Sequence, residues 1–230
     1  SFSTTYGRNV RPPEGPDAPT PAFDRIRVTA FRDYLRCPYR FWLRHILRLE
    51  PPDRLGTELD ARGFGNVLHA VVEHFANTNG ASEITDPARI REMMHAELEN
   101  ELRKLTGDVP QLGMRLQRRI LQRRLAEVAE KQAIENREGW KIEEVEYFFE
   151  ETLEIPGEPP ILVRGVADRI DRHPTRGWRI LDFKTSDRGK SPDQAHYAPR
   201  STEKWKDLQL PLYRHLLADK LVARHPGNIT

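Results

Sequence analysis

One stretch of the sequence decides the fold: residues 165–185 read GVADRIDRHPTRGWRILDFKT. Apolar and polar residues alternate on both sides of residues 173–177, a short segment with a proline and a glycine. Alternation with a period of two residues predicts strands, and a Pro/Gly turn between two strands predicts a hairpin. The sequence therefore predicts strands over residues 161–171 and 178–184.

The charged side chains of this hairpin are predicted to meet at one end of a sheet. Asp182 and Lys184 are two residues apart on the second strand, so both point to the same face. Leu181 and Phe183 point to the other face, as expected of a strand in a buried sheet. Asp168 lies on the first strand, across the hairpin, and brings a second carboxylate to the group.

Two carboxylates and an ammonium group have a chemical use together. Neighbouring carboxylates repel unless a cation lies between them, and oxygen ligands favour Mg²⁺ or Mn²⁺. Such an ion polarises a phosphodiester and lowers the pKa of a bound water. Lys184 is then expected to orient that water or to neutralise charge on the phosphate. Because Asp-x-Lys triplets are common, the alternative for the hairpin alone is a surface element with ordinary salt bridges.

Outward from the hairpin, the pattern predicts an α/β fold with a small mixed β-sheet flanked by helices. A further strand is predicted over residues 144–149, and a helical insertion separates His69 from it. One more strand is expected after the last helix, but nothing past Leu221 clearly supplies it. The predicted helices cover residues 29–37, 39–47, 64–77, 87–105, 111–137 and 203–221.

Composition bounds the remaining possibilities. Residues 1–24 are rich in Pro and Gly and predict an extended arm, while residues 25–230 are expected to form one domain. A net charge of +2 excludes a uniformly basic nucleic-acid coat but not a local basic patch. No stretch approaches the about 18 apolar residues of a membrane span, and no secretory leader is recognisable. Cys37 is the only cysteine, so no internal disulfide forms and a cytoplasmic location is expected.

Five segments resemble, in order, the motifs of RecB-like nucleases in the PD-(D/E)XK superfamily. The two halves of the hairpin look like the active-site motifs, although Ala167 stands where the superfamily name has a proline, a common departure in this subgroup. The resemblance covers roughly residues 26–222. The other three segments look like the CP-x-x-F helix, the G-x-x-x-H helix and the Q-x-x-x-Y motif: Leu35–Phe41, Gly65–His69 and Gln209–Tyr213.

The resemblance implies a restriction-endonuclease-like core and metal-dependent hydrolysis of DNA, more exonuclease than endonuclease, in repair or recombination. It implies that Asp168, Asp182, His69 and the backbone carbonyl of Phe183 hold Mg²⁺ or Mn²⁺, and that Lys184 assists the attacking water. The alternative for His69 is a partly buried helix histidine without a metal.

Three supporting residues follow from the same resemblance. Glu73 shares a helix face with His69 and is expected to support the ligands. Gln209 and Tyr213 are implied to face the active site, where they contact DNA or brace the catalytic strand. They are also compatible with the rim of an ordinary packed helix.

A stripe of arginines lies outside these motifs. Arg115, Arg119 and Arg123 recur every four residues on a predicted helix. A solvated face is the default explanation, and a phosphate-tracking surface is the functional one.

The CP-x-x-F segment raises two further questions. Tyr39, Phe41 and Trp42 either stack on bases or, more commonly for such clusters, form core. In some RecB-like nucleases the cysteine of this motif binds an iron–sulfur cluster, but a cluster needs four such ligands. The chain has one, so a cluster is not expected within it, and Cys37 is predicted to be a small buried hydrophobe. The alternative places the missing ligands beyond Thr230.

Two rival functions remain at this point. A non-catalytic DNA-binding or scaffolding domain would be expected to lose Asp168, Asp182 or Lys184, and all three are present. An RNA-directed nuclease would use the same residues. Because the chain begins with Ser1 and not Met, we expect a piece of a longer protein, with a helicase domain or subunit as its partner.

Overall fold

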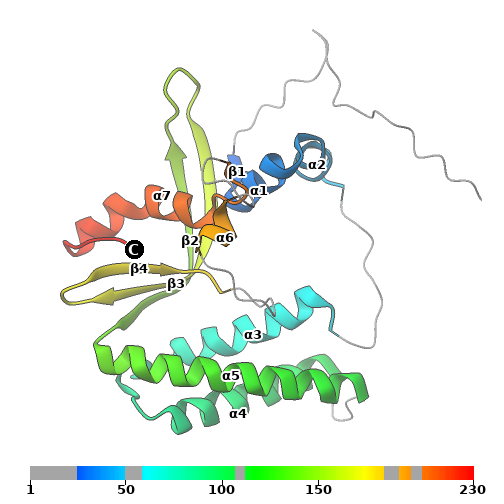
Figure 1. Cartoon of the computed structure of the whole chain (residues 1–230), viewed down its shortest axis with the longest axis vertical. Helices are drawn as coiled ribbons and strands as arrows, with labels where there is room; N and C mark the ends of the chain where they lie inside the picture. Colours follow the sequence, from blue (N-terminus) through cyan, green and yellow to red (C-terminus); the bar gives the residue numbers. More distant parts are fainter. Residues whose placement is uncertain (1–24, 50–58, 107–111, 184–191, 198–203) are drawn as a thin grey trace, which may run out of the picture. The chain divides into compact units, whose positions relative to one another are not determined.

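The computed structural model describes residues 25–49, 59–106, 112–183, 192–197 and 204–230, shown in colour in Figure 1. The predicted arm over residues 1–24 lies outside the described residues. The chain forms two compact units. The first comprises residues 1–52, 150–165 and 190–209, and the second comprises residues 53–149, 166–189 and 210–230.

A mixed four-stranded sheet runs through the chain, as predicted. Its central strand, β3 (Ile161–His173), has β2 (Lys141–Leu153) as one neighbour. Along its other edge, β1 (Arg25–Arg27) pairs in parallel with the start of β3, and β4 (Gly177–Leu181) pairs antiparallel with its end. The sequence did not predict β1, because three residues are too few to show a period of two. Strand β2 extends beyond residues 144–149 at both ends.

The predicted helices are present, but three boundaries lie three or more residues from their predicted positions. Helix α3 begins at Ala61 and not at residue 64, and the last helix ends at Arg224 and not at residue 221. The last, α7, begins at Gln209 and not at residue 203, because the Asp207 carboxylate accepts a hydrogen bond from the Gln209 amide (3.0 Å) and caps the helix there. The helical elements are α1 (Val28–Arg36), α2 (Pro38–Phe41), a π-helix (Trp42–Ile46), α3 (Ala61–Ala76), a 3₁₀ turn (Ala81–Glu83), α4 (Pro87–Thr106), α5 (Leu112–Glu138), α6 (Pro192–His196) and α7 (Gln209–Arg224).

The helical insertion forms the main core of the second unit. Helices α3, α4 and α5 pack against one another below the β3–β4 hairpin (Figure 1). Apolar residues at spacings of three and four face the helical neighbours and are almost fully buried. They include Val71, Phe75, Ile90, Met94, Leu98, Leu121 and Leu125.

The strand expected after the last helix is present in short form. Ile229 forms a parallel bridge with Trp178, and the Trp178 amide donates to the Asn228 carbonyl (2.6 Å). Gly177 makes this approach possible. It has φ +87°, and a Cβ atom there would lie 2.2 Å from the Asn228 oxygen. Only glycine fits such a position without displacing the neighbouring backbone.

The first unit corrects the prediction for Cys37. The residue lies between α1 and α2 in an extended conformation, and its side chain is exposed, not buried. Its amide donates to the Asp33 carbonyl (2.9 Å), and its carbonyl accepts from the Phe41 amide (3.1 Å). Cys37 is therefore used for its backbone in a helix-to-helix corner, which leaves the thiol outside. Within the described part of the chain, every helix is too short or too polar to span a lipid bilayer.

Candidate active site

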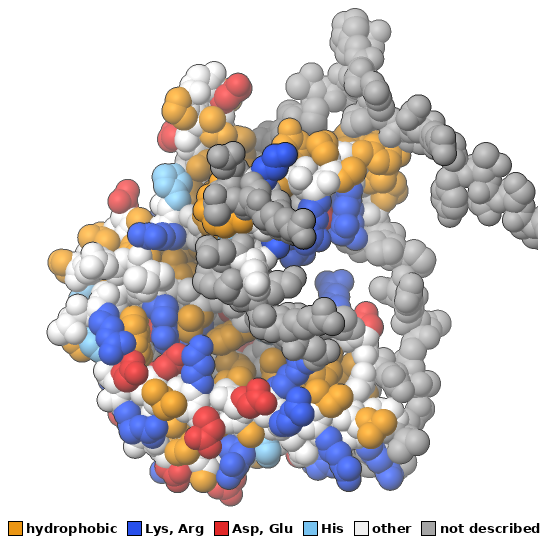
Figure 2. Space-filling view, viewed as in Figure 1, with side chains coloured by type: hydrophobic (Ala, Val, Ile, Leu, Met, Phe, Trp, Pro, Cys, Tyr) orange, Lys and Arg blue, Asp and Glu red, His pale blue; other side chains and the backbone are white. Residues whose placement is uncertain are grey.

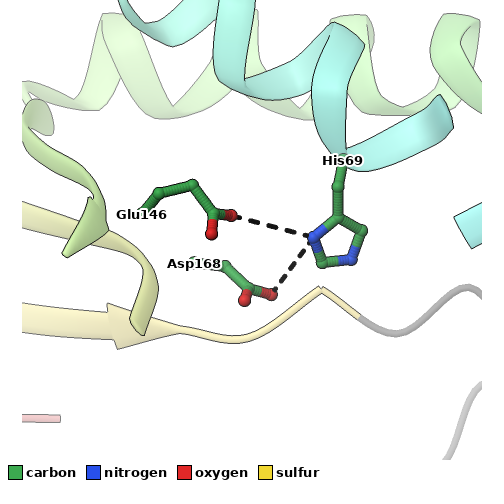
Figure 3. A group of neighbouring side chains, drawn as sticks. All are labelled: His69, Glu146 and Asp168. Atoms are coloured by element: carbon green, nitrogen blue, oxygen red, sulfur yellow. Dashed lines mark ion pairs between the residues drawn. The ribbon is translucent and has the colours of Figure 1, made fainter. Parts of the chain in front are cut away.

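Three side chains from three elements converge in the second unit (Figure 3). His69 comes from α3, Glu146 from β2 and Asp168 from β3. The His69 Nδ1 atom lies 3.8 Å from Asp168 Oδ2 and 4.0 Å from Glu146 Oε1. One ligand atom from each residue lies within 4.8 Å of the other two. Such a group has the size and the donor types of a metal site with an imidazole and two carboxylates.

Phe183 joins these residues through its backbone. Its amide donates a hydrogen bond to Asp168 Oδ2 (2.5 Å), and its carbonyl lies 3.1 Å from His69 Nε2. Its side chain packs against the helical core and meets the His69 ring edge to face at 6.0 Å. Burial of one apolar ring thus fixes two polar backbone groups beside the site.

The contact with Phe183 places a proton on Nε2 of His69. A carbonyl oxygen only accepts, so the hydrogen bond requires the proton on Nε2. In the neutral imidazole, Nδ1 then keeps its lone pair, and that atom faces Glu146 and Asp168. The predicted Phe183 carbonyl ligand lies beside the site, on the Nε2 side of the ring.

Glu146 was not predicted from the sequence. It lies inside β2 at φ +48°, in the left-handed region that non-glycine residues rarely adopt. Such backbone costs about 1–2 kcal/mol, and strained positions cluster at functional sites. Glu146 stands among other glutamates in a strand, so nothing in the pattern distinguishes it. A period of two cannot anticipate a residue that leaves the strand conformation.

The site carries an excess of negative charge. The pKa of Glu146 is raised by its burial and by the charges of Asp168 and Glu73, and only the charge of His69 lowers it. Glu73 lies one turn after His69 on α3 and is partly buried. A divalent cation among these carboxylates would relieve their repulsion. The hard oxygen donors and one imidazole therefore fit Mg²⁺ or Mn²⁺.

The strand predicted over residues 178–184 ends at Leu181, so Asp182 lies directly after β4 and not on it, and is partly buried. The register pairs Arg169 with Leu181. One further step would place Asp168 opposite Asp182, with both side chains on one face. The group within 4.8 Å nevertheless contains Glu146 and not Asp182. The assignment of Asp182 stays a prediction, and that of Lys184 falls outside the described residues.

The two Q-x-x-x-Y residues occupy the first turn and a half of α7. Tyr213 is 1% exposed and donates its phenolic hydrogen to the Val166 carbonyl (2.7 Å), two residues before Asp168. Phe149 meets the Tyr213 ring edge to face at 5.3 Å. Tyr213 thus contacts β3 through this hydrogen bond, and its predicted role in the active site stays a prediction. Gln209 is also buried, in the first turn of the helix.

A buried ionic network lies on the other face of the β3–β4 hairpin. Asp171 is fully buried and accepts hydrogen bonds from Arg169 (2.6 and 2.8 Å) and from Arg179 (2.6 Å). Glu135 of α5 pairs with both arginines at 3.1–3.3 Å. Sequence reasoning assigned these residues no role, because alternating charges on a strand resemble a solvent face. Here that face is covered by α5, and each buried charge finds a partner.

The arginine stripe of α5 is exposed. Arg115, Arg119 and Arg123 all lie at the surface, as both explanations of the stripe require. Two flanking arginines have other contacts. Arg118 pairs with Glu99 (2.7 Å), and the guanidinium of Arg124 lies over the Phe64 ring (4.9 Å).

Comparison with known families identifies the class that this fold and site represent. The sequence matches the family model described as the PD-(D/E)XK nuclease superfamily over residues 25–229. The chain belongs to this superfamily, whose name describes nucleases. A comparison with curated proteins yields no match. The class of enzyme is thus a nuclease, with DNA as the substrate that a nuclease domain of this class implies.

Proposed function

We propose that the chain is a RecB-like deoxyribonuclease that requires Mg²⁺ or Mn²⁺ and acts as an exonuclease in DNA repair or recombination. The observation that carries the proposal is the convergence of His69, Glu146 and Asp168 from three separate elements. The order of the five motifs supports the RecB-like subtype. A cytoplasmic protein that works with a helicase domain or subunit belongs to the same proposal.

Each residue of the site has a separate proposed role. Asp168, His69 and Glu146, with Asp182 beside them, would hold the metal, while the Phe183 carbonyl accepts from Nε2 of His69. The bound ion would polarise the phosphodiester and lower the pKa of a water. Phe183 keeps Asp168 in place through its amide and sets the tautomer of His69 through its carbonyl. Lys184 is proposed to stabilise charge that develops on the phosphate.

Cleavage of three DNA substrates tests this function. End-labelled single-stranded DNA, end-labelled duplex and closed circular DNA are incubated with the 230-residue chain, with Mg²⁺, with Mn²⁺ or with EDTA. Metal-dependent degradation of the linear substrates with intact circles supports the exonuclease. Cutting of the circles shows an endonuclease. An end-labelled single-stranded RNA is included as a fourth substrate, and degradation of this RNA but not of DNA contradicts the choice of substrate.

Two variants separate catalysis from contamination and from a scaffolding role. Asp182→Ala and Lys184→Ala are each expected to lose nearly all cleavage while the protein stays folded. Removal of a metal ligand or of a charge stabiliser at the reacting phosphate costs several orders of magnitude, roughly 10²–10³ for one stabilising donor. Parental rates in either folded variant would refute the assignment. DNA binding without cleavage by the parent in either metal favours the scaffolding alternative.

A further inference from the structure

Positive charge is concentrated in one segment of the first unit. Residues 25–49 contain seven arginines and one acidic residue, Asp33, a formal charge of +6 on a chain whose total is +2. Five of the arginines recur every fourth residue, from α1 to the second residue after the π-helix: Arg32, Arg36, Arg40, Arg44 and Arg48. Figure 2 shows blue basic side chains together with orange apolar ones over α1 and α2. A surface of this kind fits a polyanionic partner.

Asp33 holds two of these arginines in place without neutralising them. Asp33 is buried, and its carboxylate pairs with Arg40 (3.1 Å), Arg44 (3.4 Å) and His45 (3.1 Å). The side chains of Arg40 and Arg44 remain 43% and 41% exposed. A guanidinium has five N–H donors, so each arginine keeps donors for a phosphate. One carboxylate thus preorganises two cations and leaves a net positive surface.

Aromatic rings accompany the arginines. Tyr39 and Trp42 stack at 6.0 Å with an interplanar angle of 19°, and both are partly exposed. Phe41, by contrast, is buried. The predicted aromatic cluster therefore divides into one core residue and a surface pair that flanks Arg40 in the sequence. Ring faces next to cationic groups are the elements that bind unpaired bases and their phosphates.

Arg48 occupies a position that favours a different residue. Its φ is +54°, and the Leu49 amide donates to the Leu43 carbonyl (3.0 Å), as in a helix end of the Schellman type. Glycine or asparagine is preferred at such a position. The chain carries an arginine at this position although glycine or asparagine would fit its backbone conformation better. Strained positions of this kind point to a role in binding more than in stability.

We propose that the segment from Arg32 to Arg48 binds single-stranded DNA. The arginines contact phosphates, and the Tyr39–Trp42 pair stacks with unpaired bases. Only the choice of DNA over another single-stranded polyanion rests on the proposed function. Residues 25–49 also expose Tyr34, Leu35, Leu47 and Leu49, which would suit a protein partner. Their sequence charge of +6 and the stacked surface pair favour a nucleic acid.

Binding is measured by fluorescence anisotropy with a labelled oligothymidylate and with a duplex, in EDTA so that metal-dependent cleavage does not interfere. The main variant is Arg36→Gln/Arg48→Asn. Both arginines are exposed and pair with no described residue, and asparagine suits the conformation at position 48. The matched control is Arg89→Gln/Arg91→Gln, which removes two exposed arginines from α4. Thermal unfolding confirms that each variant is folded.

The salt dependence of affinity distinguishes contact from general charge. Each lost phosphate contact reduces the log–log salt slope by about 0.7 for a single strand, so the main variant is expected to lose about 1.4. The α4 control keeps the parental slope. Tyr39→Leu is expected to weaken oligothymidylate binding about tenfold and to leave duplex binding unchanged, because paired bases cannot stack on the ring.

Several outcomes overturn the proposal. One is a log–log salt slope in Arg36→Gln/Arg48→Asn that equals the parent's. Another is an equal reduction of this slope in the α4 control. The third is parental affinity for oligothymidylate in Tyr39→Leu. Parental affinity in all variants assigns the surface to a protein partner. Because binding is measured without metal, the two proposals fail separately. A parent that cleaves DNA while the variants bind normally refutes only this inference, and selective binding without cleavage refutes only the nuclease.

Discussion

The backbone amide of Phe183, two residues after β4, donates a 2.5 Å hydrogen bond to Oδ2 of Asp168 in β3. The same residue meets His69 through its carbonyl (3.1 Å). The position of the Asp168 carboxylate therefore depends on the backbone of the Asp-x-Lys motif.

Asp168→Asn separates the charge of this residue from its structural contact. The amide oxygen of asparagine still accepts from Phe183, so thermal stability should stay close to that of the parent. Loss of the negative ligand should lower the cleavage rate roughly a hundredfold or more. Asp168→Ala also leaves the Phe183 amide unpaired and should lose a further about 1–3 kcal/mol of stability. Initial rates and melting curves of both variants test the separation, and near-parental cleavage by Asp168→Asn would remove Asp168 from the site.

Glu146→Gly should make the folded protein more stable and weaken its metal binding. Glycine accepts φ +48° without strain, so the free energy of unfolding should rise by about 1 kcal/mol. Loss of the carboxylate should raise the Mg²⁺ concentration for half-maximal cleavage by about 10–100-fold. Glu146→Gln is the control, because it keeps the strain and removes only the charge. A metal requirement unchanged in both variants would show that Glu146 is not a ligand.

Asp171→Asn should damage the fold more than any surface change. It removes one of the two carboxylates that pair with the buried Arg169 and the partly buried Arg179 and leaves them only Glu135, which costs up to about 3–5 kcal/mol. The neighbouring Arg172 pairs with Glu143 at the surface, so Arg172→Gln should change stability by less than about 1 kcal/mol. Urea unfolding of both variants provides the measurement. Equal, small effects would mean that the buried network contributes little.

The α5 stripe is predicted to add affinity for DNA without sequence preference. The triple variant Arg115→Gln/Arg119→Gln/Arg123→Gln should reduce the log–log salt slope for duplex binding by about 0.9 for each arginine that contacts a phosphate. The three side chains are exposed, so stability should change little. If the log–log salt slope of the triple variant equals that of the parent, the stripe is a solvated surface and does not contact phosphates.

The Asp33 cluster should make stability depend on pH in acid. Burial raises the pKa of Asp33, but hydrogen bonds from His45 and Arg44 and the charges of Arg40 and Arg44 outweigh it and lower the pKa below 3.8. A lowered pKa means stability that is present above 3.8 and lost as the pH falls through the folded-state value. Urea unfolding across this range should show the loss in the parent and less of it in Asp33→Asn. If the free energy of unfolding depended on pH in the same way in both proteins, the Asp33 cluster would not be the source of the acid-dependent loss.

The sequence by itself determined the hairpin, the order of the helices and the catalytic candidates. Period-two alternation around Gly177 and period-three-and-four spacing in residues 87–137 are local signals, and each names its element directly. His69 and Asp168 were named as candidates because their segments resemble family motifs in a fixed order, and their roles stay predictions. The periodic patterns depend only on residues close together in the sequence, so they predict their elements without knowledge of the tertiary structure.

Only the tertiary structure decided which groups meet. Glu146 joined the site through a left-handed residue inside a strand, and Cys37 stayed exposed because a helix corner used its backbone. Arg169 and Asp171 became buried because α5 covers their face of the hairpin. Each outcome depends on contacts between residues distant in sequence, where burial and charge are set by the partner element and not by local pattern.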